Sequence, residues 1–101
     1  MRTLVIGDIH GGLRALLQLL GKLNLHPEDR LIFLGDYIDG WSEAAQVIEF
    51  LLNFRNSYSC VFIKGNHDIW CEEWLAGKEA EDSWLNNGGL ATIQSYAKFS
   101  Q

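Results

Sequence analysis

The ten residues Leu31–Gly40, LIFLGDYIDG, join an uninterrupted apolar run to a turn rich in glycine and aspartate. A short apolar run bounded by such a turn is typical of a buried strand, and continuous apolarity favours a strand of a parallel sheet. The chain repeats this arrangement twice, as TLVI before Gly-Asp in Thr3–Asp8 and as CVFIK before Gly-Asn in Cys60–Asn66. The sequence therefore predicts three buried strands, each ending in a turn of glycine and a polar residue.

Two amphipathic helices are predicted between these strands. Leucines between Leu13 and Leu23 recur at i, i+3, i+4 and i+7, and the apolar residues of Ala44–Leu51 do the same, which puts each set on one helical stripe. Ser42 is the predicted N-cap of the second helix. The alternation of strands and helices over residues 1–68 predicts an α/β fold, a βαβαβ unit with a parallel sheet and flanking helices.

The remaining residues, 69–101, predict a short C-terminal helical segment. Its pattern breaks near Gly77 and at Asn87–Gly89, because glycine and asparagine favour helix ends and turns. At 101 residues the chain has the length of one domain. A last apolar stripe is predicted from Leu90, Ile93 and Ala97.

The composition is that of an ordinary globular domain, and its charge balance excludes some classes of partner. Eight Lys and Arg against 13 Asp and Glu leave a net charge of −5, so no dominant positive field attracts nucleic acid or an anionic membrane. The apolar runs are too short to span a bilayer, and Met1–Asp8 lacks the pattern of a secretory signal. Cys60 and Cys71 form no CxxC pair, which predicts free thiols in a reducing cytoplasm.

The three turns are predicted to converge. In an open parallel sheet the carboxyl ends of all strands lie at one edge, and sites form in the crevice there. Asp8, Asp36 and Asn66 should therefore lie close together, although long stretches of chain separate them. Four of the six Asp and two of the three His lie in or beside these turns: Asp8, His10, Asp36, Asp39, His67 and Asp68.

So many carboxylates on one rim would repel each other unless cations neutralised them. Mixed Asp oxygen, Asn oxygen and His nitrogen donors suit manganese, iron, zinc or cobalt better than calcium or a structural zinc. Two such ions roughly 3.5–4 Å apart, bridged by a carboxylate, form a clamp for a phosphoester. Asp36, in the middle turn, is the natural bridging ligand.

These motifs resemble a known family. Gly7–Gly11 (GDIHG), Gly35–Gly40 (GDYIDG) and Gly65–Asp68 (GNHD) resemble the three N-terminal motifs of the calcineurin-like metallophosphoesterases, closest to the serine/threonine protein phosphatase and bacterial diadenosine tetraphosphatase branch. Asn87–Gly89, followed by Thr92 and Tyr96, is also similar to a stretch of bacterial members. The resemblance covers essentially the whole chain and implies the N-terminal half of that family's αββα sandwich.

The resemblance also implies roles for individual residues. Asp8 and His10 would hold a first metal ion, Asp36 would bridge it to a second, and Asn66 would bind the second. A hydroxide bridging the two ions would attack phosphorus in line. His67 would be the general acid at the leaving group, oriented by Asp39.

Two departures from the family pattern stand out. Gly40 occupies the position of an arginine that binds phosphate in the protein phosphatase branch, and Arg14 or Lys64 could replace it electrostatically. The family's second metal takes two further histidines from a C-terminal half, whereas His26 is expected on a solvated loop at the opposite end of the sheet. The second site therefore lacks ligands here, and the chain resembles the N-terminal portion of a catalytic domain.

Several residues near the motifs have simpler interpretations. Asp68 is predicted to cap the helix that follows it, and Trp84 to be buried against its neighbours. Tyr37 and Trp41 either line a substrate pocket or pack in the core.

The sequence thus predicts a metal-dependent phosphoesterase acting on a phosphoprotein or nucleotide through two divalent ions, manganese first, with iron, zinc or cobalt as alternatives. A symmetrical dinucleoside polyphosphate hydrolase is the alternative within enzymes. The alternative outside enzymes is a non-catalytic fragment that associates with itself, because a small sheet leaves an apolar face that a second copy could cover.

Overall fold

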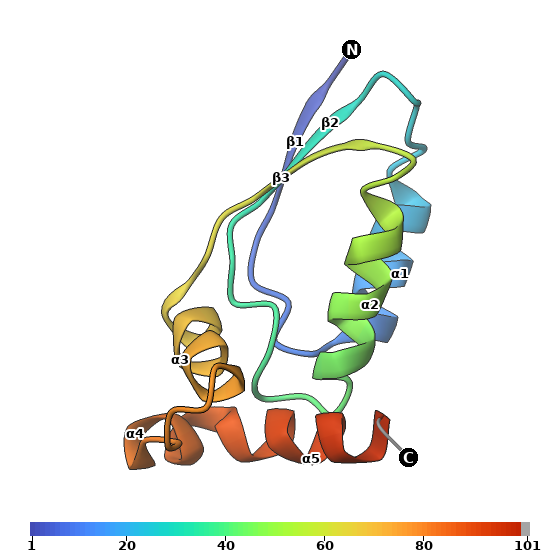
Figure 1. The fold of residues 1–101 in the computed structure, drawn as a ribbon. Helices are drawn as coiled ribbons and strands as arrows, with labels where there is room; N and C mark the ends of the chain where they lie inside the picture. Colours follow the sequence, from blue (N-terminus) through green and yellow to red (C-terminus); the bar gives the residue numbers. More distant parts are fainter. Residues whose placement is uncertain (100–101) are drawn as a thin grey trace.

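The three predicted strands form one parallel sheet in the computed structural model, which describes residues 1–99 (Figure 1). The strands are β1 (Thr3–Ile6), β2 (Arg30–Phe33) and β3 (Ser59–Phe62), in the order β1-β2-β3. Their register aligns each strand's first residue with that of its neighbour. The predicted α/β class is confirmed.

Helices α1 (Leu13–Lys22) and α2 (Ala44–Phe54) connect the strands and lie on the same side of the sheet (Figure 1). Two successive right-handed crossovers in one direction produce this arrangement. Between sheet and helices, Leu31 and Phe33 are fully buried, and the Phe33 ring stacks on a ring of β3. Of the predicted leucine stripe, Leu16 is buried, but Leu17 points away and is 44% exposed.

The opposite face of the sheet is apolar and open in the described part of the chain. The register puts Val5, Ile32 and Val61 side by side across the three strands. Their side chains point away from α1 and α2, because successive residues of a strand face opposite sides. Val5 is 59% exposed and Ile63, just beyond β3, is 46% exposed.

The C-terminal segment consists of α3 (Asn66–Leu75), α4 (Asp82–Trp84), a kinked turn η1 (Leu85–Gly89) and α5 (Leu90–Phe99). Gly77 and Gly88 adopt positive φ angles of 102° and 104°, so both predicted breaks are present. Helix α5 lies across the end of the molecule toward which the strands run (Figure 1).

The predicted apolar stripe of α5 is correct only at Ile93, which packs against the core, whereas Ala97 is exposed. Leu90 is 53% exposed, whereas Thr92 and Ser95 are buried. The buried side of α5 faces the loop after β2 and the start of α2, where backbone N–H groups need hydrogen-bond acceptors. Hydroxyl groups meet that need and apolar side chains do not.

The predicted N-cap of α2 is also wrong. The residue before the helix is Glu43, with no capping hydrogen bond from its side chain. Instead the Ser95 hydroxyl accepts the N–H of Ala45 at 3.1 Å and donates to Gln46 Oε1 at 3.1 Å. A residue of α5 therefore provides a cap that Ser42 was expected to provide locally.

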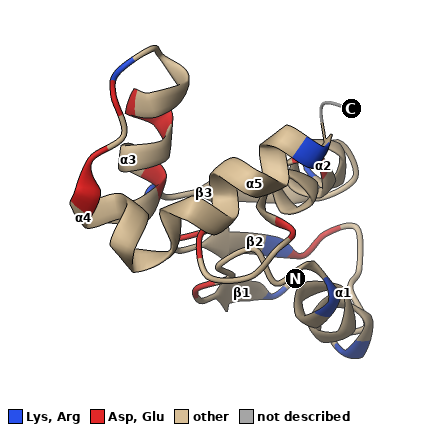
Figure 2. Ribbon diagram, turned by 90° about the horizontal axis from the view of Figure 1, so that it is seen from below, with Lys and Arg blue, Asp and Glu red and all other residues tan. Residues whose placement is uncertain are grey.

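Among residues 1–99, no helix is long and apolar enough to cross a membrane. Lys and Arg positions are scattered over the ribbon rather than gathered on one element (Figure 2).

An ion pair ties the amino end of the sheet together. Arg2 Nη2 lies 2.8 Å from Asp29 Oδ2 and also donates to the carbonyl oxygens of Leu23 and Asn24, at 2.8 and 3.0 Å. Asp29 accepts the N–H of His26 as well, at 3.0 Å. The hydrogen bond from Arg2 holds the pKa of Asp29 well below its usual range, helped by the backbone bond. His26 itself is exposed.

We expect Asp29→Asn to weaken the fold in a pH-dependent way. Because the folded pKa lies below the ordinary value of 3.8, ionised Asp29 stabilises the fold at higher pH, and this contribution disappears as pH falls through the folded pKa. Urea unfolding from pH 7 to pH 3 should therefore show a gap between wild type and Asp29→Asn that shrinks below about pH 4. The exposed neighbour Glu28 provides a control, since Glu28→Gln should show no such gap. A gap for Asp29→Asn that stays constant with pH would contradict the assignment.

Candidate metal centre

The loops after β1 and β2 are joined by backbone hydrogen bonds. The N–H groups of Ile9 and His10 both donate to the carbonyl oxygen of Asp36, at 3.1 and 2.9 Å, and Gly11 N–H donates to Tyr37 O at 2.8 Å. His10 and Asp36 have φ angles of +49° and +53°, a backbone region that residues other than glycine seldom adopt. Such strain persists only where the surrounding structure enforces it, and it clusters at functional sites.

Two glycines bring the third turn against the second. A Cβ atom on Gly35 would lie 2.5 Å from the Gly65 nitrogen, and a Cβ atom on Gly65 would overlap the Asp36 carboxylate. The φ of +112° at Gly35 also favours glycine. The approach of these turns therefore depends on the absence of side chains at both positions.

Asp68 fastens the same contact. Its carboxylate accepts the N–H groups of Gly65 at 2.8 Å, Asp36 at 2.5 Å and Tyr37 at 2.9 Å. Burial raises the pKa of Asp68, although these three hydrogen bonds oppose the shift. The predicted cap of α3 is confirmed, and the same side chain also ties the loop after β2 to the helix.

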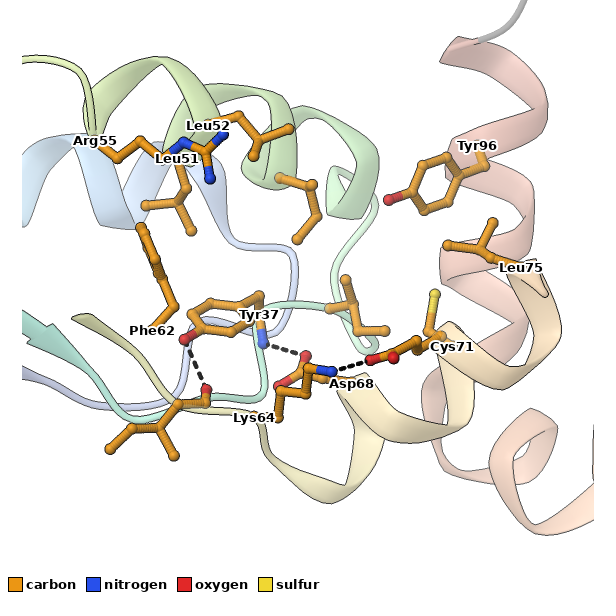
Figure 3. A pocket seen from close by; sticks show the side chains of 14 residues that line it. Tyr37, Leu51, Leu52, Arg55, Phe62, Lys64, Asp68, Cys71, Leu75 and Tyr96 are labelled. Carbon is orange, nitrogen blue, oxygen red and sulfur yellow. Dashed lines mark hydrogen bonds and ion pairs between the residues drawn. The ribbon is translucent and has the colours of Figure 1, made fainter. Parts of the chain in front are cut away.

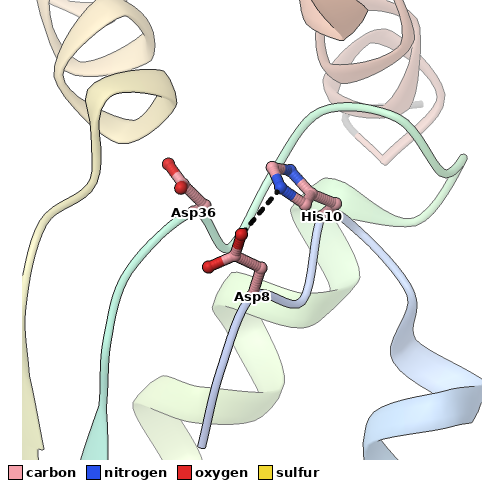
Figure 4. Close-up of side chains that lie close together, drawn as sticks. All are labelled: Asp8, His10 and Asp36. Carbon is pink, nitrogen blue, oxygen red and sulfur yellow. Dashed lines mark ion pairs between the residues drawn. The ribbon is translucent and has the colours of Figure 1, made fainter.

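Asp8, His10 and Asp36 meet at the carboxyl end of the sheet (Figure 4). Each offers one ligand atom, and these atoms all lie within 4.8 Å of one another. His10 Nδ1 is 2.8 Å from the carbonyl oxygen of Ile38. Since a carbonyl only accepts, Nδ1 carries the hydrogen and Nε2 keeps its lone pair, 3.5 Å from Asp8 Oδ2. In metal sites a carbonyl bonded to one ring nitrogen commonly orients the imidazole whose other nitrogen binds the ion, so the donors fit a transition-metal ion.

Asn66 begins α3 beside this cluster. It is exposed and lies between Gly65, which contacts Asp36, and His67, whose N–H is 3.3 Å from Asp36 Oδ1. The predicted metal residues thus all lie at one edge of the sheet, Asp8, His10 and Asp36 in loops and Asn66 at the first position of α3. Their roles as ligands remain predictions.

His67 and Asp39 form a close pair next to the cluster. His67 Nδ1 lies 2.6 Å from Asp39 Oδ2, and Asp39 is 1% exposed. The His67 ring stands edge-on to the His10 ring, with 5.2 Å between centroids. The structure therefore brings the two predicted acid residues together beside the predicted metal ligands. Their catalytic role remains a prediction.

Two residues of the C-terminal segment also reach Asp39. The Trp84 indole donates to Asp39 Oδ2 at 2.7 Å, and the Thr92 hydroxyl bonds both the N–H and the carboxylate of Asp39. Sequence reasoning favoured burial for Trp84, which is 1% exposed, and did not predict its contact with Asp39. The resemblance around Asn87–Gly89 was the one signal near these residues, and it gave no reason for contact with Asp39.

Lys64 and Tyr37, two of the residues considered for substrate contact, have partners within the protein. Lys64 forms an ion pair with Glu72 on α3. Trp41 is 69% exposed, whereas Tyr37 is buried and donates its hydroxyl to Ile63 O at 2.8 Å. Burial raises the pKa of Tyr37 to about 12, so its hydroxyl stays protonated at neutral pH.

One cavity of the described residues is not lined by Asp8, His10 or Asp36. It measures about 390 Å³ and opens between α2, α3, α5 and the edge strand β3 (Figure 3). Its walls are mainly apolar, with Leu51, Phe62 and Tyr96 among them. Burial raises the pKa of Cys71, on its wall, to about 12, which leaves that thiol a poor nucleophile. The chemistry-bearing groups therefore point to the loops and not to this cavity.

The fold and the site together are those of a metallophosphoesterase domain, with motifs rich in metal-binding residues at one edge of a parallel sheet. Residues 1–99 match the family described as calcineurin-like phosphoesterase. The chain belongs to this family.

Three relatives indicate the part of the family that it resembles. A symmetrical bis(5'-nucleosyl)-tetraphosphatase of Marinomonas sp. (strain MWYL1) is 43% identical over 70 residues, 68% of this chain and 25% of that protein. The enzyme of the same name from Pseudomonas putida (strain W619) is 37% identical over 70 residues, 68% of this chain and 24% of that protein. A candidate serine/threonine-protein phosphatase of Caenorhabditis elegans is 34% identical over 69 residues, 66% of this chain and 15% of that protein. The chain thus matches a quarter or less of the length of these relatives.

We expect Gly65→Ala to damage both fold and site. The added methyl group meets the Asp36 carboxylate and backbone, and overpacking of this kind costs about 1–3 kcal/mol. Urea unfolding and a Mn²⁺ titration measure the two effects. Gly21→Ala is the matched control, since nothing lies within 4 Å of its Cβ and a helical alanine should add about 0.5–1 kcal/mol. Unchanged Mn²⁺ affinity in Gly65→Ala would show that the metal ligands do not depend on this contact.

Proposed function

We propose that this chain carries the divalent-metal centre of a phosphoesterase. The observation that supports this most is the meeting of Asp8, His10 and Asp36 within 4.8 Å, with the His67–Asp39 pair alongside. A cluster of two carboxylates and an oriented imidazole binds metal ions. A proton donor next to it suits the cleavage of an ester bond.

The residues divide between holding cations and moving a proton. Asp8 and His10 Nε2 would hold a first ion, Asp36 would contact two, and Asn66 would contact the second. Bound cations would supply the positive charge that holds a phosphoryl group and activates water for attack. As the oxygen of water bonds to phosphorus, the ester P–O bond breaks, and His67 gives its Nε2 proton to the leaving oxygen. Asp39 accepts from Nδ1 throughout, so Nε2 is the nitrogen that faces the leaving group.

Manganese is the proposed metal, with iron, zinc or cobalt as alternatives, because carboxylate and imidazole donors suit all four. A second ion has fewer ligands here. Within residues 1–99 the remaining histidine, His26, is exposed on the loop that Asp29 anchors at the other end of the sheet. We therefore expect tight binding of one ion and weaker binding of a second.

The proposed substrate is a phosphorylated protein or nucleotide. Symmetrical hydrolysis of a dinucleoside polyphosphate is the second candidate, favoured by the names of the two relatives at 43% and 37% identity. The net charge of −5 gives an anionic substrate no general attraction. Binding of either substrate would therefore depend on the bound cations.

A reducing cytoplasm is the proposed location, because it suits the two unpaired thiols, Cys60 and Cys71.

A second copy of the chain is the proposed occupant of the open sheet face. Apolar faces of this kind favour association. Sedimentation velocity should detect dimers that Val5→Lys abolishes. Leu17→Lys, which alters a similarly exposed leucine on α1, should leave them intact. A wild-type chain that stays monomeric at high concentration would remove this part of the proposal.

We expect the chain to bind Mn²⁺ and to hydrolyse a chromogenic phosphate ester. Asp36→Asn should weaken Mn²⁺ binding by about 100-fold or more, because it removes the central carboxylate, and should abolish turnover. Isothermal titration and absorbance assays measure both, with Asp82→Asn, an exposed carboxylate far along the chain, as control. Release of nucleoside diphosphate from diadenosine tetraphosphate would select the polyphosphate substrate.

The outcomes separate the three alternatives. Turnover that depends on Asp36 supports the enzyme. Bound Mn²⁺ without turnover supports a non-catalytic fragment. Failure of the folded chain to bind any of the four metals would end the proposal of a metal centre.

A further inference from the structure

Asp39 receives more hydrogen bonds than a partner of His67 alone would need. Its Oδ2 accepts from His67 Nδ1 at 2.6 Å and from Trp84 Nε1 at 2.7 Å. Its Oδ1 accepts from the Thr92 hydroxyl. We propose that Trp84 and Thr92 are positioning residues, which lock Asp39 so that it holds His67 in the orientation its proton transfer needs. This inference rests on the proposed function.

The bonds reach the carboxylate from separate elements. Trp84 ends α4, Thr92 lies in the first turn of α5 and His67 lies in the first turn of α3. A buried carboxylate that breaks one such bond finds no water to replace it, and Asp39 is 1% exposed. Rotation about its side-chain bonds would break bonds to at least one of these partners. The carboxylate therefore has one orientation, and the imidazole that it holds has one as well.

Thr92 holds the backbone of Asp39 together with its side chain. Its Oγ1 accepts the Asp39 N–H at 2.9 Å while its hydroxyl hydrogen goes to the Asp39 carboxylate. Asp39 has a φ of +70°, a left-handed conformation that an aspartate keeps only with local support. A single hydroxyl thus fixes the positions of both the backbone N–H and the carboxylate of Asp39.

The glycines between Trp84 and Thr92 make this geometry accessible. A Cβ atom on Gly88 would lie 2.8 Å from the nitrogen of Gly40, and one on Gly89 would lie 2.6 Å from the Trp84 ring. The φ of +104° at Gly88 turns the chain so that α5 returns toward Asp39. A side chain at Gly88 or Gly89 would therefore clash with the residues around Asp39 and Trp84, which explains the two glycines of Asn87–Gly89.

A purely structural role would be the alternative, since Trp84 also packs on Trp74, with 5.7 Å between ring centroids. The two roles differ in what they change. Loss of packing lowers the free energy of unfolding but leaves the hydrogen atom of His67 on Nδ1. Loss of positioning frees the Nδ1–H group from Asp39, so that its hydrogen exchanges with solvent even in a folded chain.

Nuclear magnetic resonance of the imidazole distinguishes the roles without any assay of activity. In the wild type we expect a slowly exchanging His67 Hδ1 signal and a ring protonated at Nδ1, because the Nδ1–H group is bonded to a buried carboxylate. Thr92→Val, which keeps shape but removes the hydroxyl, should abolish this signal, and Trp84→Phe should do the same. Thr92→Ser should restore it, and Trp74→Phe, a packing change alone, should leave it in place. Circular dichroism confirms that each variant is folded.

Leaving-group dependence provides the second readout where the chain turns over substrate. Thr92→Val should lower kcat for phenyl phosphate roughly 10-fold and for 2,4-dinitrophenyl phosphate less than about 2-fold, because a good leaving group needs no proton. KM should change little, since neither residue meets the substrate.

Each outcome decides the inference. A His67 Hδ1 signal that persists in folded Thr92→Val and Trp84→Phe overturns it, as do equal losses for both leaving groups. If the chain has no turnover, the enzymatic part of the proposed function fails, while the resonance data still decide whether Trp84 and Thr92 position the pair. If Thr92→Val does not fold, Trp84→Phe carries the same test, with Trp74→Phe as its control.

Discussion

The backbone contact between Gly35 and Gly65 is the constraint on which the site depends. A parallel sheet aligns the ends of β2 and β3, but ordinary side chains would hold the two turns too far apart for Asp36 to reach the start of α3. Asp68 then converts proximity into a fixed geometry, because its carboxylate accepts N–H groups from both turns. The strained backbone at Asp36 persists because these bonds surround it.

Charge is arranged differently at the two ends of the sheet. At the amino end, Asp29 pairs with Arg2, so this carboxylate is compensated within the described chain. At the carboxyl end, the ion pairs of Asp8 and Asp39 are with imidazoles, and Asp36 lies between the turns with backbone N–H contact. Carboxylates gathered without Lys or Arg partners are the electrostatic condition under which a divalent cation binds.

The C-terminal helices take part in the site and do more than cover it. Helix α5 presents buried hydroxyls where an amphipathic pattern would present apolar side chains. Ser95 caps α2, and Thr92 bonds the residue that holds His67. Both contacts join positions about fifty residues apart. The same helix therefore contacts both a crossover helix and the residue that pairs with His67, beside Asp8, His10 and Asp36.

The three strands, the two crossover helices and the gathering of Asp8, His10, Asp36 and Asn66 at one edge could be predicted from the sequence alone. They depend on local apolar runs, on helical periodicity and on the general rule that parallel strands share one carboxyl end. The pairing of His67 with Asp39 was accessible only through the resemblance to a family. The cap of α2, the polar buried side of α5 and the bonds from Trp84 and Thr92 to Asp39 were decided by the tertiary structure. Each joins residues distant in the chain through a single hydroxyl or indole. Periodicity and spacing along the sequence do not indicate which distant N–H or carboxylate such a group will contact.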